Sequence, residues 1–358
     1  MSAPPFEETL QGASPIDVYR HTMSVPSLRR YLEIKAHHLL CERDWASIRV
    51  VGAYDRDCVA SANEKNDKLF NWQRPTAEVH GDCLVIKCFP GLDYVRHYAL
   101  VIATYLSLAG RYRGQVSYEP PDERACAAAV ERLDLDPSGD DLVVLGWGLG
   151  HFTDPGAWTA GHGYAWQRAE HQGRRVLYLG YQHSIWGDTA GRVVSRLAAL
   201  GARRVAYIGK VGALDPAIAP NACLATGDTS ILGDGPVSWR NVFAGLADGQ
   251  PDVRHGVHVT SPSILLEDTR WLAGQGDRAF VDPEIGHMGR AAACSGIEFG
   301  FLHVVSNNLA AAYPADLSNE RLVHVIERRA RLLDRIHEII RGRLEVIPRY
   351  CPAGGTHP

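Results

Sequence analysis

Short apolar runs that end in glycine-rich turns, with helical patterns between them, constrain the fold of this chain most. Residues 142–145 lead into Gly146-Trp147-Gly148-Leu149-Gly150, and residues 204–208 lead into Gly209-Lys210-Val211-Gly212. Short strands that alternate with helices predict an α/β fold with a mixed, mostly parallel sheet covered by helices. In such sheets ligands bind beyond the carboxyl ends of the strands, where these turns lie.

The remaining elements divide the chain near residue 135. After it, we expect further strands and helices at 175–179, 189–200, 222–226, 257–261, 279–282, 284–295, 299–306 and 319–344. Before it, we expect strands at 47–54, 82–88 and 114–118 and helices within 27–41, 94–108 and 122–133. The linker-like stretch 134–140 (DLDPSGD) suggests a boundary. The sequence thus predicts an additional N-terminal α/β region over 1–135, whose role is unknown, and a main domain over 136–358.

Charge and composition exclude several classes of partner. The formal net charge is −4 and no basic run occurs, so a nucleic acid or a membrane surface is not expected. The most apolar stretch, residues 98–110, is shorter than the roughly 20 residues that a bilayer requires. The eight cysteines are scattered, so we expect reduced thiols in a soluble, cytoplasmic protein. Lysine is scarce, which makes Lys210 in its glycine-rich turn conspicuous.

Several familiar sites are absent from the sequence. The first turn does not fit G-x-G-x-x-G, and the next strand ends in Gly180-Tyr181 instead of an acidic residue, which argues against a Rossmann dinucleotide site. The Gly209-Lys210 turn lacks the upstream glycine and the following Ser/Thr of a P-loop. No G-x-S-x-G occurs and the histidines do not have metal-ligand spacing. We therefore expect no cofactor and no metal.

Five turns, taken in order, carry a resemblance to a known superfamily. They are VVLGWGLG at 143–150, GYQHSIWG at 180–187, AYIGKVGALDP at 206–216, Asp282-Pro283-Glu284, and VVSN at 304–307. Together they resemble the purine nucleoside phosphorylase and nucleosidase superfamily over residues of about 140–345. The resemblance implies that family's α/β fold and an enzyme acting on the N-glycosidic bond of a nucleoside or nucleoside-like compound, most simply a purine one.

The resemblance also implies roles for three catalytic candidates. Glu284 matches the glutamate that grips the ribose hydroxyls, although a helix N-terminal acid that complements the helix dipole is the alternative. Asn307 falls where nucleosidases carry an aspartic acid and trimeric phosphorylases an asparagine that faces the base. An amide donates and accepts hydrogen bonds but cannot give up a proton as a carboxylic acid does. His183 is the residue retained from the second turn.

The phosphate side of the site departs from the family. Trp147, Tyr181 and Trp186 stand where the resemblance places a serine, an arginine and an acidic residue. Bulky neutral side chains remove the donors that hold inorganic phosphate, and Lys210 would restore one cation. Further ligand-binding candidates are Gly146, Gly148, Gly209, Ser306 and the apolar pair Ile264 and Leu265. For this pair, a base-lining turn and an ordinary buried strand end remain equal alternatives.

Three functions follow from these residues. The first is cleavage of an N-glycosidic bond, by hydrolysis or an atypical phosphorolysis. The second is a catalytically degenerate protein that binds a nucleoside-like ligand, and the third is the same scaffold used for another reaction in specialised metabolism. Because Trp158, Trp166 and Trp186 are close in sequence and aromatic patches mark interfaces, we also expect a homo-oligomer.

Overall fold

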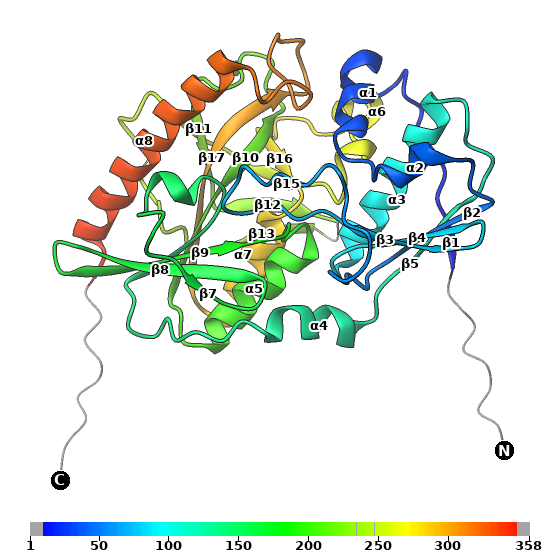
Figure 1. Ribbon diagram of the computed structural model, residues 1–358. Coiled ribbons are helices and arrows are strands. Elements are labelled where there is room, and N and C mark those ends of the chain that lie inside the picture. Colours follow the sequence, from blue (N-terminus) through cyan, green and yellow to red (C-terminus); the bar gives the residue numbers. More distant parts are fainter. Residues whose placement is uncertain (1–9, 234, 247, 349–358) are drawn as a thin grey trace.

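The computed structural model describes residues 10–233, 235–246 and 248–348 (Figure 1). The ends of the two expected units, residues 1–9 and 349–358, lie outside this part. The architecture is mixed α/β and contains two sheets. The first has the order β1-β5-β2-β4-β3 and the second, with twelve strands, contains the path β13-β12-β15-β16-β10-β6-β9-β8-β7. Strand β17 joins the second sheet beside β10, β11 pairs with β17, and β14 pairs with β11.

The first sheet and its helices lie at the right of Figure 1 and come from the first third of the chain. Its apolar core includes Ile48, Leu84, Ile86 and Val95. The elements are β1 (Gln11–Gly12), α1 (Val25–Glu33), α2 (Leu39–Glu42), β2 (Ser47–Val51), β3 (Thr76–His80), β4 (Cys83–Lys87), α3 (Leu92–Leu108), β5 (Val116–Glu119) and α4 (Glu123–Glu131).

The second sheet begins after the predicted linker. Its strands are β6 (Leu142–Gly146), β7 (Thr159–Ala160), β8 (Tyr164–His171), β9 (Arg174–Tyr181), β10 (Arg204–Ala213), β11 (Leu224–Thr226), β12 (Thr229–Leu232), β13 (Gly235–Ser238), β14 (Val253–His255), β15 (His258–Thr260), β16 (Phe280–Asp282) and β17 (Glu298–Asn308). Its helices are α5 (Asp188–Ala199), α6 (Thr269–Ala273), α7 (Ile285–Ser295) and α8 (Val323–Val346), with short 3₁₀ turns η1 (Leu149–His151) and η2 (Ile264–Leu266).

Three parallel strands form the centre of the second sheet, as the sequence predicts. Strand β10 pairs in parallel with β6 on one side and with β17 on the other. The strands that run into Gly146 and Gly209 and the strand that contains Ser306 are therefore neighbours. Strand β10 is longer than predicted and reaches Ala213, with a bulge at Val211/Gly212 opposite β17.

Helices cover both faces of this sheet. Buried residues of α5 and α7, such as Val193 and Met288, share a core with Leu177 of β9. On the opposite face Ile336 of α8 packs in a second core with Val144 of β6. Each of these amphipathic helices buries its apolar side against the sheet, because an apolar sheet face exposed to water is unfavourable. The result is a covered sheet whose strand ends remain available for a site.

An apolar contact joins the N-terminal region to the second sheet. Leu28, Leu32 and Val101 pack with Leu265 in one buried cluster. The Asn71 backbone amide also donates to the Tyr181 carbonyl at 2.9 Å. The N-terminal region is thus held against the carboxyl ends of the central strands. No helix of the described residues is long and apolar enough to cross a membrane.

Candidate active site

A cavity of about 550 Å³ lies between the carboxyl ends of the central strands and the N-terminal region. Strands β6, β10, β16 and β17 contribute one wall, and residues 31–35, 65–74 and 94–98 contribute the other. All the expected site residues except Leu265 line it: Gly146, Trp147, Gly148, Tyr181, His183, Gly209, Lys210, Ile264, Glu284, Ser306 and Asn307. Leu265 instead has its side chain buried in the apolar contact with Leu28 and Val101.

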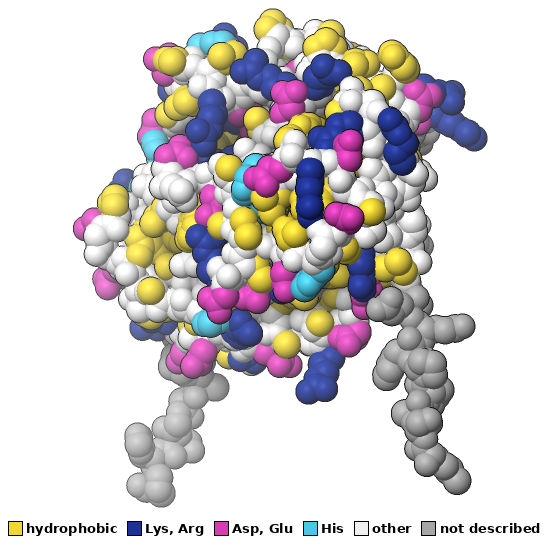
Figure 2. All heavy atoms as spheres, turned by 45° about the vertical axis from the view of Figure 1, so that its right-hand side comes forward, with side chains coloured by type: hydrophobic (Ala, Val, Ile, Leu, Met, Phe, Trp, Pro, Cys, Tyr) yellow, Lys and Arg dark blue, Asp and Glu magenta, His cyan; other side chains and the backbone are white. Residues whose placement is uncertain are grey.

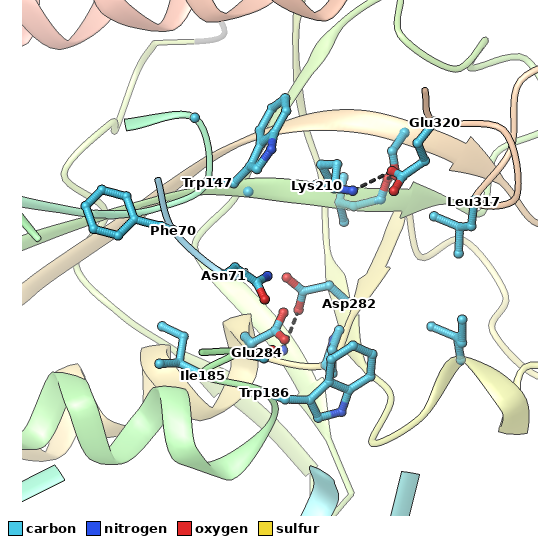
Figure 3. A pocket seen from close by; sticks show the side chains of 18 of the residues that line it. Phe70, Asn71, Trp147, Ile185, Trp186, Lys210, Asp282, Glu284, Leu317 and Glu320 are labelled. Atoms are coloured by element: carbon cyan, nitrogen blue, oxygen red, sulfur yellow. Dashed lines mark hydrogen bonds and ion pairs between the residues drawn. The ribbon is translucent and has the colours of Figure 1, made fainter. Parts of the chain in front are cut away.

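Glu284 and Asp282 meet at the floor of the cavity, where β16 turns into α7 (Figure 3). One carboxylate oxygen of Asp282 accepts hydrogen bonds from the backbone amides of Glu284 and Ile285, both at 2.9 Å. These bonds hold the turn that places the Glu284 side chain in the cavity. Burial, and then the neighbouring Asp282 charge, raise the pKa of Glu284 well above its ordinary value, while a hydrogen bond from the Gly187 amide acts in the opposite direction.

Asp282 has two histidine neighbours from adjacent strands. His258 Nε2 lies 3.1 Å from Asp282 Oδ1, and His303 Nε2 lies 3.4 Å from Oδ2. Burial alone would raise the Asp282 pKa, but His258 and His303 hold it well below its usual range. Ser230 Oγ lies 2.9 Å from His258 Nδ1 and fixes that ring. Asp282 is therefore an ionised, buried carboxylate directly beside a protonated one.

Asn307 lies across β10 from this acidic turn. Gly212 of β10 is in register with Asn307 on one side and with Val281, which precedes Asp282, on the other. The Ser306 hydroxyl donates to Asn307 Oδ1 at 3.0 Å, which orients the amide. Within the described chain, Asn307 Nδ2 forms no hydrogen bond, so this donor is available to a ligand. Glu284 and Asn307 thus approach one cavity from two strand ends.

The three aromatic residues of the expected phosphate side, Trp147, Tyr181 and Trp186, line the cavity, and Trp186 also has partners in the N-terminal region and a nearby loop. Trp186 donates to the Pro262 carbonyl at 3.1 Å and stacks on His97 with ring centroids 4.3 Å apart. His183 stacks on Phe89 at 4.3 Å, and burial lowers its pKa, so it is neutral at pH 7. Tyr181 Oη is buried and lacks a partner among the described residues.

Lys210 is less available than the sequence suggests. Its Nζ forms an ion pair with Glu320, a residue of the segment before α8 (Figure 3). The same Glu320 oxygen accepts a 2.9 Å hydrogen bond from Arg329. Both cations, acting against burial, hold the Glu320 pKa well below its usual range. The charge of Lys210 is therefore already shared with a carboxylate, and it does not act alone as the replacement cation.

The sequence motifs do not predict the wall of the cavity formed by residues 31–35, 65–74 and 94–98, called here the N-terminal wall. This wall brings five basic side chains to the cavity: Lys35, Lys65, Lys68, Arg74 and His97. The five residues are spread over 63 positions with no recognisable spacing. The scarcity of lysine in the chain is the one sequence signal, and it applies only to the three lysines. The wall shows that residues 1–135 contribute directly to the cavity.

The tryptophans that suggested an interface do not form one patch. Trp158 packs on the core beneath α8, Trp166 packs on the core beneath α5, and Trp186 packs on the N-terminal core. Each is partly buried within the chain. The homo-oligomer remains a prediction, but this aromatic patch does not support it.

Comparisons with known proteins give the following similarities. No family model matches the chain. A curated relative, the oxidoreductase cns1 of Cordyceps militaris, is 26% identical over 289 residues, which take in 72% of this chain and 35% of that protein. The chain thus spans about a third of the curated relative's length.

Among solved structures, the P. knowlesi homologue of P. falciparum PNP matches with a TM-score of 0.45 and 14% identity, over 60% of this chain and 93% of that one. An S-adenosylhomocysteine nucleosidase of Streptococcus pyogenes matches with a TM-score of 0.44 and 13% identity, over 58% and 97% of the two chains. A futalosine hydrolase mutant of Helicobacter pylori matches with a TM-score of 0.44 and 12% identity, over 57% and 99%. The chemistry of the cavity is assigned from this chain's own residues.

Proposed function

We propose that this protein is an enzyme that cleaves the N-glycosidic bond of a nucleoside or nucleoside-like compound, with a purine as the base. The observation that carries the proposal is the meeting of Glu284 and Asn307 in one cavity, on opposite sides of Gly212. The first is a carboxyl group suited to sugar hydroxyls, and the second is an amide suited to the edge of a base. The motif resemblance assigns the same two roles.

Glu284 is the proposed ribose-binding residue. Breaking the C–N bond creates positive charge on the sugar, so a group that orients the sugar and becomes negative stabilises the transition state. The raised pKa keeps Glu284 protonated before a ligand binds. Ribose hydroxyls that donate to the carboxylate favour its ionised form, so binding lowers this pKa and prepares the charge that the reaction needs.

Asn307 and His183 are the proposed groups on the side of the base. The Asn307 amide donates to and accepts from the base but cannot transfer a proton. His183 is neutral at pH 7 and lines the same cavity, so it is the candidate for moving a proton to the leaving base. Asp282 is a positioning residue, because its carboxylate is occupied by two backbone amides and two histidines.

Water is the proposed nucleophile. An inorganic phosphate ion needs several N–H donors. The side chains on the expected phosphate side are bulky and offer at most one neutral donor each: Trp147, Tyr181 and Trp186. Lys210 is paired with Glu320. We therefore favour hydrolysis. An atypical phosphorolysis is the alternative reaction, and the experiment below distinguishes the two. We also propose that the enzyme is cytoplasmic and acts as a homo-oligomer.

The test is incubation of the purified protein with a panel of purine and pyrimidine nucleosides and their 5′-monophosphates, with and without inorganic phosphate. Chromatography then detects the free base. The proposal expects base release that does not require phosphate and is lost in Glu284→Ala. Tight binding of a panel member without base release would identify a nucleoside-binding protein instead.

A further inference from the structure

Four of the five lysines in the chain line the same cavity. These are Lys35, Lys65, Lys68 and Lys210, and Arg74 joins them from the N-terminal wall. The fifth, Lys87 on β4, lies outside the cavity and is neutralised by Glu78 at 2.8 Å and Asp55 at 3.6 Å. A chain that otherwise uses arginine for its positive charge therefore concentrates its lysines in one place.

Three of these lysines have no counter-ion. Within residues 10–233, 235–246 and 248–348, the Nζ atoms of Lys35, Lys65 and Lys68 have no carboxylate oxygen within 4.0 Å and form no hydrogen bond. Arg74 is buried, and its Nη1 donates only to oxygens of Asn71 and Gln73, while its Nε has no partner in that part of the chain. We call Lys35, Lys65, Lys68 and Arg74 the cation cluster.

The carboxyl groups of the cavity do not balance the cation cluster. Glu320 is occupied by Lys210 and Arg329, and Asp282 by its two histidines. Burial raises the pKa of Glu267 to about 8, and the pKa of Glu284 is also raised, so both carboxyls are largely protonated at pH 7. The carboxyl groups of the cavity therefore supply little negative charge to the cation cluster.

The cations lie close enough to repel one another. Burial first, and then repulsion from Arg74 and the neighbouring lysines, lowers the pKa of Lys35 to about 7, of Lys65 to about 6 and of Lys68 to about 8. Glu320 opposes the shift at Lys35 and Lys68 without cancelling it. At pH 7 Lys65 is therefore largely neutral and Lys35 about half protonated in the free protein, while Lys68 is largely charged. A bound anion favours the charged amines and raises these pKa values, so the cation cluster takes up protons as the anion binds.

The outer face on the side of the N-terminal region has no concentration of basic side chains. The face in Figure 2, which brings the N-terminal region forward, carries acidic and basic side chains interspersed. A large basic face would indicate a polyanion such as a nucleic acid. Basic side chains without carboxylate partners among the described residues, inside a cavity of about 550 Å³, instead fit a small anionic ligand.

We propose that the cation cluster binds a phosphate group carried by the ligand, so that the substrate is a nucleotide or similarly phosphorylated compound and not a neutral nucleoside. This inference rests on the proposed function, because Glu284 and Asn307 hold the sugar and the base while the N-terminal wall holds the phosphate. It also gives residues 1–135 a role, since they supply all four members of the cation cluster. Free inorganic phosphate has the same chemistry, and the experiment separates the two sources.

The experiment measures binding by titration calorimetry with ribose 5-phosphate, ribose, inorganic phosphate, and matched pairs of purine nucleosides and 5′-monophosphates. The proteins are the full chain, the double variant Lys65→Gln/Lys68→Gln, and Lys87→Gln as the matched control. The phosphorylated member of each pair should bind at least about 10-fold more tightly to the full chain. The double variant should lose this preference and Lys87→Gln should keep it. Thermal unfolding checks that the variants are folded. We expect the double variant to fold, because removing two neighbouring basic groups reduces their mutual repulsion.

Equal binding of ribose and ribose 5-phosphate, or a preference that survives in the double variant, would overturn the proposal. So would inorganic phosphate that binds at the cation cluster and increases nucleoside cleavage, because the anion would then be a co-substrate. Inorganic phosphate that competes with ribose 5-phosphate supports the proposal. A phosphate preference without base release from any compound leaves the cation cluster assigned and rejects the proposed N-glycosidic cleavage.

Discussion

The backbone amide of Glu284 donates a 2.9 Å hydrogen bond to Asp282 Oδ1, and these two carboxyl groups, two residues apart, have opposite pKa shifts. Asp282 is held ionised by His258 and His303, whereas Glu284 is held protonated by burial and by Asp282 itself. Carboxyl pairs with separated pKa values divide the work of a site, because one stays charged while the other can change its protonation state. The pair therefore supplies a fixed structural charge and an adjustable group.

Substitution of Glu284 by glutamine should stabilise the protein increasingly as pH rises. The folded pKa of Glu284 lies above its unfolded value of about 4.3, so its favourable contribution is complete below that pH and is lost as pH rises through the folded pKa. Glutamine does not titrate. Denaturant unfolding should show a larger variant advantage at pH 8 than at pH 5. This advantage grows by about 1.4 kcal/mol for each pH unit between the unfolded pKa of about 4.3 and the folded pKa, and is constant above the folded pKa. A pH-independent difference would contradict the assigned shift.

Substitution of Asp282 by asparagine should have the opposite sign. The folded pKa of Asp282 lies below its unfolded value of about 3.9, so its contribution is present above that pH and is lost as pH falls toward the folded pKa. At pH 7 the variant should be less stable by about 1–3 kcal/mol, because buried histidine nitrogens lose their charged partner. The free energy of unfolding should then decrease less steeply with falling pH in the variant than in the parent protein. An unchanged midpoint at pH 7 would mean that the histidines do not depend on Asp282.

Substitution of Glu284 by alanine should weaken ligand binding without unfolding the protein. Loss of one charged hydrogen-bonding partner costs roughly 1.5–3 kcal/mol of binding free energy. Glu123→Ala is the matched control, because that carboxylate pairs with Arg192 and does not line the cavity. Titration calorimetry with a ligand found in the panel measures both. Unchanged affinity in Glu284→Ala would remove Glu284 from the site.

Substitution of Gly146 by alanine should destabilise the first turn. Gly146 has a φ of 121°, and a Cβ there would lie 2.0 Å from the Ile208 carbonyl oxygen. Gly150 is the control in the same turn, since a Cβ there meets only Leu69 at 3.7 Å and its φ is not positive. Gly146→Ala should lose at least about 2 kcal/mol of unfolding free energy and Gly150→Ala much less. Similar losses in the two variants would contradict the requirement for glycine at position 146.

The central strands were predictable because their signals are local. Residues 142–145 and 205–208 are apolar, buried runs that end at glycine, and the structure pairs these two strands with each other and β10 with β17. Strands β3 and β8 were not predicted, because TAEVH and YAWQRAEH mix polar and apolar residues on half-exposed strands. A strand with one covered face is expected to alternate apolar and polar residues, and neither segment alternates cleanly.

The site was predictable only where turns carry its residues. Glu284 and Asn307 lie in recognisable turns, whereas His258 and His303 reach Asp282 from different strands through the sheet order. Lys35, Lys65 and Lys68 belong to a region with no recognised motif, and the cavity unites them through a contact between two sheets. Pairings set by topology over more than 200 residues leave no local spacing to detect.

The most direct measurement of the central claim is the stoichiometry of products from the compound that the panel identifies as the best substrate. Mass spectrometry should detect one free base and one free sugar or sugar phosphate for each substrate consumed, without added inorganic phosphate. The Glu284→Ala variant should form neither product while Glu123→Ala forms both. Consumption of the compound with its N-glycosidic bond intact, or no consumption of any bound panel member, would contradict the account.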